Sequence, residues 1–446
     1  MPPKVALIIC TMFVLWLLHL EHKEAPEASF ALWIPTLWML LIASKPLAVW
    51  FGTGGQDMES GSPLDRYFLS TLFCLGLLIL AKRKFNWSTA VRENIWIILI
   101  VSYMLVSIFW SANPYMSFKR WSRELIAVVM AFIVLSERNP RQAMQSILMR
   151  CAYILIPFSL LLIRYFGYYG RMYHRWSGEL MWIGVTTHKN SLGRLCIIAS
   201  FFLVWTLVKR WHGSTIPHNK YQTYADLFVL ILTFYLLKGP SHFYSASSFI
   251  ALAAGFAIFV ALLWRKKRQI TLGENTLSII MAFVIGFGVL TPMVGGSTLS
   301  GLTNTVGRDE TLTGRTEIWA KYLPIALKRP ILGHGIGGFW STSTAEEMTV
   351  KEAHNGYLEI IMDLGFLGLL LVSIYLISCC RKAKKELEHD FYWGILWICF
   401  LFIVAIHNIA ESSLNTLASQ PMATLLFLSV CSTTATSNTT GVSTWL

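Results

Sequence analysis

The chain has 446 residues, of which 55% are hydrophobic and 14% charged, and its formal net charge at pH 7 is +13. A soluble domain carries nearer a quarter charged residues, so this composition excludes an ordinary soluble protein. Apolar runs of about 20 residues, the length of a helix that spans a bilayer, recur along the whole chain. The alternating ten-residue strands of a membrane barrel do not occur. We therefore predict an all-α, polytopic helical membrane protein in contact with the lipid bilayer.

In chain order, the apolar runs predict about 12 or 13 transmembrane helices. They lie near residues 5–20, 30–50, 66–82, 94–110, 122–136, 147–166, 190–209, 223–238, 246–264, 277–295, 356–378, 391–409 and 415–432. The first run resembles a signal peptide, but the many later spans favour a retained helix. The second contains Ser44-Lys45-Pro46 and is expected to bend or to insert only in part. One long polar segment, residues 296–355, interrupts the series, so we predict a single membrane domain, 1–446, with one large loop.

Lysine and arginine predict the orientation of these helices, because cytoplasmic connections are enriched in both residues. Every second connection is basic, and we call these the five basic connections. They are residues 82–93, 137–142, 209–213, 265–269 and 381–385. Placing them in the cytoplasm puts the large loop outside, and by the same count the N-terminus as well. The N-terminal assignment reverses if one early segment does not span.

Several segments on the predicted outer side are also basic, against this orientation rule. Their cations are Lys119, Arg120, Arg123, Arg164, Arg171, Arg175, Lys189, Arg194, Arg308 and Arg315. An arginine at bilayer depth costs about 2.5–3.5 kcal/mol on insertion scales, so it usually has a partner or a ligand. A solvated surface charge would explain any one of them. Together they predict an external cationic pocket for an anionic ligand, and the arginine fork is suited to phosphate.

The familiar cofactor and metal motifs are missing from the sequence. It has no GxxxxGK[ST] phosphate loop, no DxD pair, and no HExxH or GxSxG. The eight cysteines all fall in or beside apolar segments, without a CxxC pair. We therefore expect no cofactor, no metal and no nucleic-acid partner. Any chemistry would depend on single polar side chains around the external arginines.

Three polar stretches at predicted membrane ends are the candidates for such chemistry. The first, "VTTHKNSLGRLC", places His188, Lys189 and Asn190 at the start of a span, with Arg194 one turn deeper. The second, residues 311–340, begins an amphipathic helix with "GRTEIW" and continues into the glycine-rich "RPILGHGIGGF". The third is "EAHNGYLEIIMDLGFLGLLL", which begins at residue 352 with polar side chains and ends as an apolar helix.

Each candidate also has a purely structural interpretation. His354 could cap the apolar helix or bond a loop carbonyl, and His188 could be loop scaffolding. Glu359 is expected to pair with arginine or to orient His354, although a catalytic carboxylate is also open. Glu411, in "HNIAESSL", lies on one helical face with His407 and is interpreted as an internal polar brace or as support for the site.

The second and third stretches resemble the bacterial O-antigen ligase and polymerase superfamily, which includes exopolysaccharide polymerases. The resemblance rests on Gly314-Arg315 with Trp319, on Pro330 followed by Gly333, Gly335 and Phe339, and on His354-Asn355 with Leu358, Gly365 and Gly368. These motifs cover about 60 residues. "THKNSLG" and "SANPYMSFKRWSRE" are also similar to features of the exopolysaccharide branch.

The resemblance implies a metal-independent glycosyltransferase with a GT-C-like membrane fold in the bacterial inner membrane. Its active site would face the periplasm, partly on the loop 296–355, and its donor would be a saccharide on undecaprenyl pyrophosphate. The residues carried over as catalytic are His354 and Arg315. The expected donor-binding residues are Arg194, Arg171, Lys189, Arg120, Arg123 and Arg308, with Asn355, Glu359, His188, Asn190 and Glu411 in support. Attack opposite the leaving group would invert the anomeric centre.

Two questions remain open at the level of sequence. A transporter or flippase of a lipid-linked glycan would also need polar sites inside the membrane. The one-sided cations and the lack of a visible inverted repeat favour the enzyme. The acceptor could be another lipid-linked glycan, lipid A–core or a protein, and "THKN" favours an exopolysaccharide polymerase.

Overall fold

The structure is a computed structural model, and it describes residues 1–52, 62–83, 85–174, 178–213, 220–240, 244–294, 310–342, 345 and 352–431. Within these residues the chain is helical, apart from one small hairpin. Strands β1 (Arg171–Tyr173) and β2 (Leu180–Trp182) pair antiparallel, with Met172 opposite Met181. The predicted class, an all-α polytopic membrane protein, is confirmed.

Helix occupies every one of the predicted spans in the described part of the chain. The helices are α1 (Pro3–Glu24), α2 (Trp33–Ile42), α3 (Leu47–Phe51), α4 (Pro63–Lys82), α5 (Trp87–Glu93), α6 (Ile95–Ser107), α7 (Pro114–Leu135), α8 (Pro140–Tyr165), α9 (Gly167–Gly170), α10 (Lys189–Gly213), α11 (Lys220–Lys238), α12 (Ala246–Lys267), α13 (Thr276–Leu290), α15 (Glu310–Ala326), α17 (Gly356–His389), α18 (Phe391–His407) and α19 (Gln420–Cys431). Short 3₁₀ turns lie at Phe30–Leu32, Ile108–Trp110 and Phe339–Ser341.

Six of the described helices are long and apolar enough to cross a membrane, judged by length and composition. A seventh span results if α5 and the helix that follows it, which meet at an angle of 85°, count as one. Shorter apolar helices include α13, α18 and α19. The predicted total of 12 or 13 requires that these three helices and α2, α7 and α11 also cross the membrane, and it stays a prediction.

The second predicted segment is broken, as its Ser-Lys-Pro sequence indicates. Helix α2 ends at Ile42 and α3 begins at Leu47. Between them the ammonium group of Lys45 donates hydrogen bonds to the carbonyl oxygens of Gly184, at 2.7 Å, and Thr186. The break therefore ties the N-terminal helices to the segment that leads into α10.

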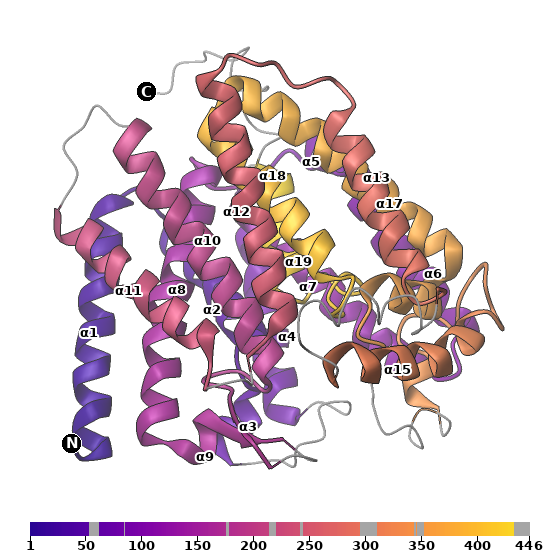
Figure 1. The fold of residues 1–446 in the computed structure, drawn as a ribbon, viewed down its shortest axis with the longest axis horizontal. Helices are drawn as coiled ribbons and strands as arrows, with labels where there is room; N and C mark the ends of the chain where they lie inside the picture. The colour runs from indigo at the N-terminus through magenta and orange to yellow at the C-terminus, as the bar shows by residue number, and fades with distance from the viewer. Residues whose placement is uncertain are drawn as a thin grey trace.

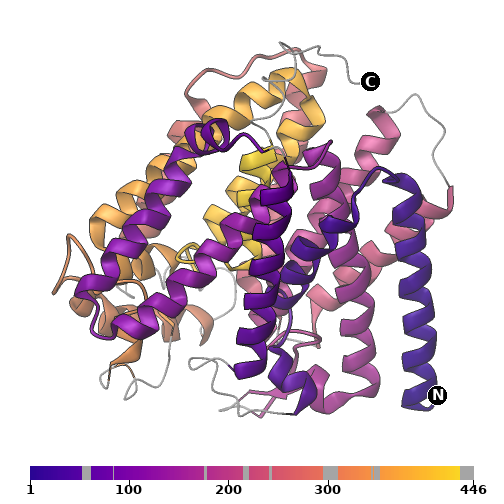
Figure 2. The same ribbon diagram turned by 180° about the vertical axis from the view of Figure 1, so that it is seen from behind.

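The five basic connections meet at one end of the helix bundle, which agrees with their predicted common side. Figure 1 shows α5 at this end, and α3, α9 and α15 at the opposite end. Seen from behind, the helices of residues 62–135 (purple) cover the face opposite α12 (Figure 2). Residues of the basic connections contact one another or nearby helix ends: Arg83–Glu137 (2.7 Å), Arg141–Glu386, Arg210–Glu24 (2.8 Å), Lys382 with the carbonyl of Glu93 (2.7 Å), and Lys266 over the Phe391 ring (4.0 Å).

Helix α17 is broken at Gly365, and the glycine-rich loop packs into the break. Gly365 has φ 67° and ψ −171°, a backbone conformation open to glycine and strained for other residues. The amide of Phe366 donates to the carbonyl of Pro330 at 2.7 Å, and that of His334 donates to Met362 at 2.8 Å. Two of the motifs that carry the family resemblance are thus packing partners.

We expect Gly365→Ala to lower the midpoint of thermal unfolding in detergent. Its Cβ would lie 2.2 Å from the carbonyl oxygen of Ile331, and the positive φ would add strain of about 1–3 kcal/mol. Gly286→Ala is the matched control, because no atom lies within 4 Å of an added Cβ there. An unchanged midpoint for Gly365→Ala would show that the break tolerates a side chain.

Candidate functional site

The segment between α18 and α19 is the centre of the polar contacts, and Asn408 shapes it. The Asn408 side-chain oxygen accepts hydrogen bonds from the amides of Ser413, at 2.7 Å, and Leu414, at 2.9 Å. Its amide nitrogen donates to the carbonyl of Val404 at 2.8 Å. Asn408 is fully buried, so these bonds also satisfy groups that water does not reach. A single side chain thereby folds the segment back on the end of α18.

Asn355 joins this segment to the start of α17. Its side-chain oxygen accepts from the amide of Leu358 at 2.9 Å, so Asn355 is the N-cap of α17. Its amide nitrogen donates to the carbonyls of Gly288, at 3.0 Å, and Ile409, at 3.1 Å. The alternative that His354 caps this helix is therefore wrong.

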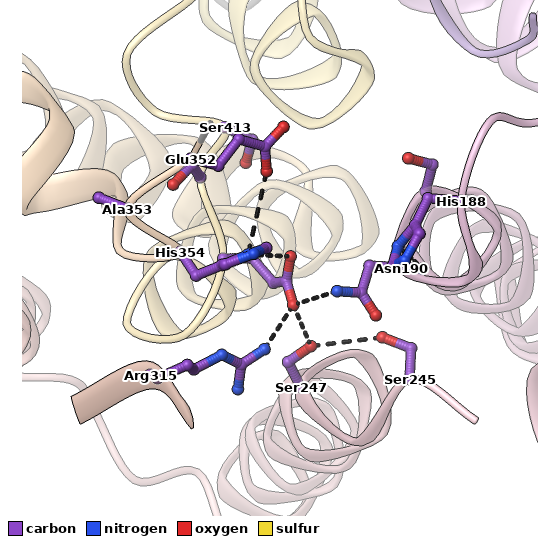
Figure 3. A network of polar contacts seen from close by, with 12 residues as sticks. His188, Asn190, Ser245, Ser247, Arg315, Glu352, Ala353, His354 and Ser413 are labelled. Atoms are coloured by element: carbon purple, nitrogen blue, oxygen red, sulfur yellow. Dashed lines mark hydrogen bonds and ion pairs between the residues drawn. The ribbon is translucent and has the colours of Figure 1, made fainter. Parts of the chain in front are cut away.

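Glu411 lies at the centre of the site, with a side chain that is 2% exposed. Its Oε1 accepts from the guanidinium of Arg315 at 2.7 Å, the side-chain amide of Asn190 at 2.8 Å and the hydroxyl of Ser247 at 3.1 Å. These donors come from α15, α10 and α12, and their side chains converge in Figure 3. One buried carboxylate thus holds three helices of the described structure to the α18–α19 segment.

Opposing influences act on the pKa of Glu411. Burial alone would raise it, because a carboxylate loses its hydration inside the protein. The facing His354 and the cation of Arg315 outweigh this effect and hold the pKa of Glu411 below its ordinary value. The group is therefore an anion at neutral pH.

His354 precedes α17 in a left-handed backbone conformation, with φ 49°. This conformation is uncommon outside glycine, and functional sites are where such strain gathers. Its Nδ1 lies 3.8 Å from Oε2 of Glu411 and 3.9 Å from Oε2 of Glu352. Nδ1 is buried and has no hydrogen-bond partner within the described residues, while the side chain as a whole is 23% exposed. The imidazole thus has one ring nitrogen turned inward.

The residue before His354 is fixed from two sides. The amide of Ala353 donates to Oε1 of Glu359 at 2.8 Å, and its carbonyl accepts from the indole of Trp319 at 2.9 Å. The other oxygen of Glu359 accepts from Asn415 at 3.0 Å. Glu359 therefore supports the turn that carries His354, and Trp319 connects α15 to the same turn.

The first turns of α10 add cations to the site, and His188, just before the helix, adds a second imidazole. Arg194 donates to the carbonyl of Ser412 at 3.2 Å and to the hydroxyl of Ser191 at 2.9 Å. Lys189 and Ser245 line one small pocket. His188 accepts the amide of Asn190 on its Nδ1 at 3.3 Å, and burial lowers the pKa of His188 to about 4. His188 is consequently neutral at physiological pH.

The remaining expected donor-binding residues lie elsewhere or outside the described residues. Arg171 is on the hairpin, where its Nε donates to the carbonyl of Ile163 at 2.6 Å. Arg120 packs so closely on Gly337 of the glycine-rich loop that an added Cβ would lie 2.1 Å from its guanidinium. Arg123, one turn further along α7, is exposed. No described contact joins these three to Glu411, and Arg308 lies outside the described residues.

Sequence reasoning underestimated two features of the site. It placed Glu411 among the supporting residues, whereas Glu411 makes the central contacts of the described site. Ser247, which is not among the expected site residues, also donates to Glu411. The available signal was a cluster of polar residues, "HNIAESSLN", between two apolar segments.

We expect the pH dependence of stability to change in His188→Asn. The folded state holds the His188 pKa at about 4, below the ordinary histidine value of 6.5, so the unfolded chain binds this proton first as the pH falls. Stability from His188 is therefore complete above about pH 6.5 and falls as the pH drops toward 4. Asparagine can still accept the Asn190 amide, so thermal unfolding of the variant should depend less on pH in this window. If the unfolding midpoints of the variant and the wild type changed with pH in the same way, the lowered pKa of His188 would be contradicted.

Two comparisons with known proteins agree with the motifs in this site. The sequence model described as "O-Antigen ligase" matches residues 227–373, which include Arg315 and His354. Over 313 residues the chain is 26% identical to "Exopolysaccharide production protein ExoQ" of Rhizobium meliloti (strain 1021), covering 66% of this chain and 67% of that protein. The function class is accordingly polysaccharide biosynthesis of the ligase or polymerase type. Together with the helical membrane fold, these two matches support placing the chain in the O-antigen ligase and polymerase superfamily.

Proposed function

We propose that the chain is a metal-independent glycosyltransferase that moves a saccharide from undecaprenyl pyrophosphate to an acceptor hydroxyl. The observation that carries the proposal is the meeting of Arg315, Glu411 and His354 at one end of the helix bundle. A fixed cation, a buried carboxylate and an imidazole with one inward nitrogen are the groups such a transfer needs. The arginines supply the positive charge that a metal ion supplies in other transferases.

The position of the site supports a reaction at the periplasmic face of the bacterial inner membrane. Helix α10 begins at Lys189, beside the site. Its last turn contains Arg210, which belongs to one of the basic connections. Its 25 residues rise about 1.5 Å each, which is roughly the thickness of a bilayer. The site therefore lies a membrane thickness away from the connections assigned to the cytoplasm.

The cations suit a diphosphate leaving group. Guanidinium has five N–H donors in a planar fork, and Glu411 takes one from Arg315 among the described contacts. Arg194 contacts only neutral oxygens in the described contacts, so no carboxylate there compensates its charge. As the glycosidic bond breaks, the pair would stabilise the charge that develops on the diphosphate. Because the lipid diphosphate is already an activated leaving group, the transfer needs no nucleotide.

His354 is the proposed general base. Its Nδ1 faces Glu411, which leaves Nε2 for the acceptor. The imidazole would take the hydroxyl proton as the acceptor oxygen bonds the anomeric carbon and the carbon–diphosphate bond breaks. The neutral form of an imidazole is the one that can accept a proton. Attack from the face opposite the diphosphate inverts the anomeric centre.

We expect His354→Ala to reduce transfer by at least about 10²-fold, the usual contribution of a general base. Purified protein would be incubated with undecaprenyl-pyrophosphate glycan, and the elongated product would be measured. His212→Ala is the matched control, because His212 is exposed at the far end of α10. Unfolding midpoints of both variants should match that of the wild type. Full activity of His354→Ala would remove His354 from the chemistry, and transport without a new glycosidic bond would favour the flippase.

We further propose that the acceptor is another lipid-linked repeat, so that the enzyme is an exopolysaccharide polymerase rather than a lipid A–core ligase. The name of the R. meliloti relative, an exopolysaccharide production protein, and the "THKN" stretch both favour this. Deleting the gene should leave single repeats on the lipid carrier, measured by mass spectrometry of extracted lipids. Accumulation of long, unattached chains would instead indicate a ligase.

A further inference from the structure

The contacts of Glu411 are unequally divided between its two carboxylate oxygens. The hydrogen bonds from Arg315, Asn190 and Ser247 all go to Oε1. The other oxygen, Oε2, faces Nδ1 of His354 at 3.8 Å, which is beyond hydrogen-bond range. Nδ1 is buried and unpartnered within the described residues. A donor and an acceptor thus lie opposite each other, separated by about 1 Å more than a bond requires.

We propose that Arg315 couples binding of the lipid diphosphate to activation of His354, with Glu411 as the positioning residue between them. In the free protein Arg315 pairs with Glu411, and the arriving diphosphate takes over the guanidinium. Glu411 then closes on His354 Nδ1 and strengthens the base. The inference rests on the proposed function, because it needs a diphosphate at Arg315.

The exchange is favoured by the charges of the groups involved. Arginine binds phosphate oxygens bidentately, and a diphosphate has more negative charge than the single carboxylate it displaces. Once Arg315 turns to the diphosphate, Glu411 is a buried anion without its strongest donor. A buried charge without a partner is costly, and the nearest unsatisfied donor is Nδ1 of His354. Asn190 and Ser247 keep hold of Oε1 and prevent the carboxylate from leaving.

Other charged groups face the same space, and one of them provides a control. The neighbours are His188, Lys189 and Arg194 from α10 and its approach, His407 from α18, and Glu352 from the turn before α17. Glu352 is 3.9 Å from His354 Nδ1, nearly the distance of Glu411. It is 58% exposed and has no described contact with Arg315. The two carboxylates are therefore matched in distance and differ in their connection to Arg315.

The test is the titration of His354 with and without a lipid diphosphate. Hydrogen–deuterium exchange at the imidazole C2 carbon, followed by mass spectrometry of the His354 peptide, gives its midpoint pH. Farnesyl diphosphate is the probe and farnesol is the uncharged control, both with full-length protein in nanodiscs. Binding of each probe is measured separately by calorimetry.

We expect farnesyl diphosphate to raise the His354 midpoint by about 1 pH unit, the effect of an opposite charge at contact distance. Glu352→Gln should keep this rise, and Glu411→Gln should lose most of it. Glutamine retains an oxygen for Asn190 and Ser247, and unfolding midpoints report whether the variant is folded. Arg315→Gln should show a raised midpoint without any probe, because its Glu411 is already released.

The possible outcomes separate this inference from the proposed function. If the probe binds and the midpoint rises equally in Glu411→Gln, the coupling is refuted while the diphosphate site stands. If the wild-type midpoint does not move on binding, the coupling is refuted without reference to any variant. If farnesyl diphosphate binds no better than farnesol, the diphosphate site itself fails, and the coupling fails with it.

Discussion

The buried carboxylate of Glu411 is the constraint on which the site depends. An anion that is 2% exposed must be surrounded by donors, and those donors are on α10, α12 and α15. Helices in a bilayer gain little from apolar contact with one another, because lipid tails are equally apolar. A polar contact at the membrane end can therefore determine which helices meet. Removing one donor would leave the others around a charge that the protein cannot hydrate, so assembly of the site and its electrostatics depend on each other.

Most motif residues act on the backbone around the polar centre. Asn355 caps α17 and joins it to α13 and the α18–α19 segment. Trp319 and Glu359 hold the two sides of Ala353, which leaves His354 in its left-handed conformation. The glycines of the loop and of α17 allow backbone contacts that any side chain would block. Arg315 and His354 instead extend their own polar groups toward Glu411, as Asn190 and Ser247 also do.

Sequence predicted the features that depend on local composition. Apolar length located the helices, and lysine and arginine grouped the connections that meet at one end. Neither signal says which external side chains converge, because that depends on contacts across long stretches of chain. Arg171 and Arg194 are on the same predicted side of the membrane. Arg171 nevertheless donates to the nearby carbonyl of Ile163, whereas Arg194 donates to the α18–α19 segment. Glu411 and His354 are separated by two helices, α17 and α18, so no spacing rule could join them. The resemblance pointed to His354 and Arg315, and it could not rank Glu411 above the other supporting residues.

Arginines at the two ends of the bundle have different partners, and this difference affects the binding of an anion. At the basic end, arginines such as Arg83 and Arg210 contact carboxylates, which compensate their charge. At the site, Arg194 is held by a carbonyl and a hydroxyl, oxygens that fix its position without cancelling its charge. Arg315 has a carboxylate, but that carboxylate also faces an imidazole with no other described hydrogen-bond partner for its inward nitrogen. A cation held in place by neutral groups keeps its attraction for an incoming anion. A cation whose carboxylate partner can turn to a second group can exchange that carboxylate for the incoming anion. The site end is thus arranged to accept negative charge. At the basic end, carboxylates already neutralise much of the positive charge of the arginines.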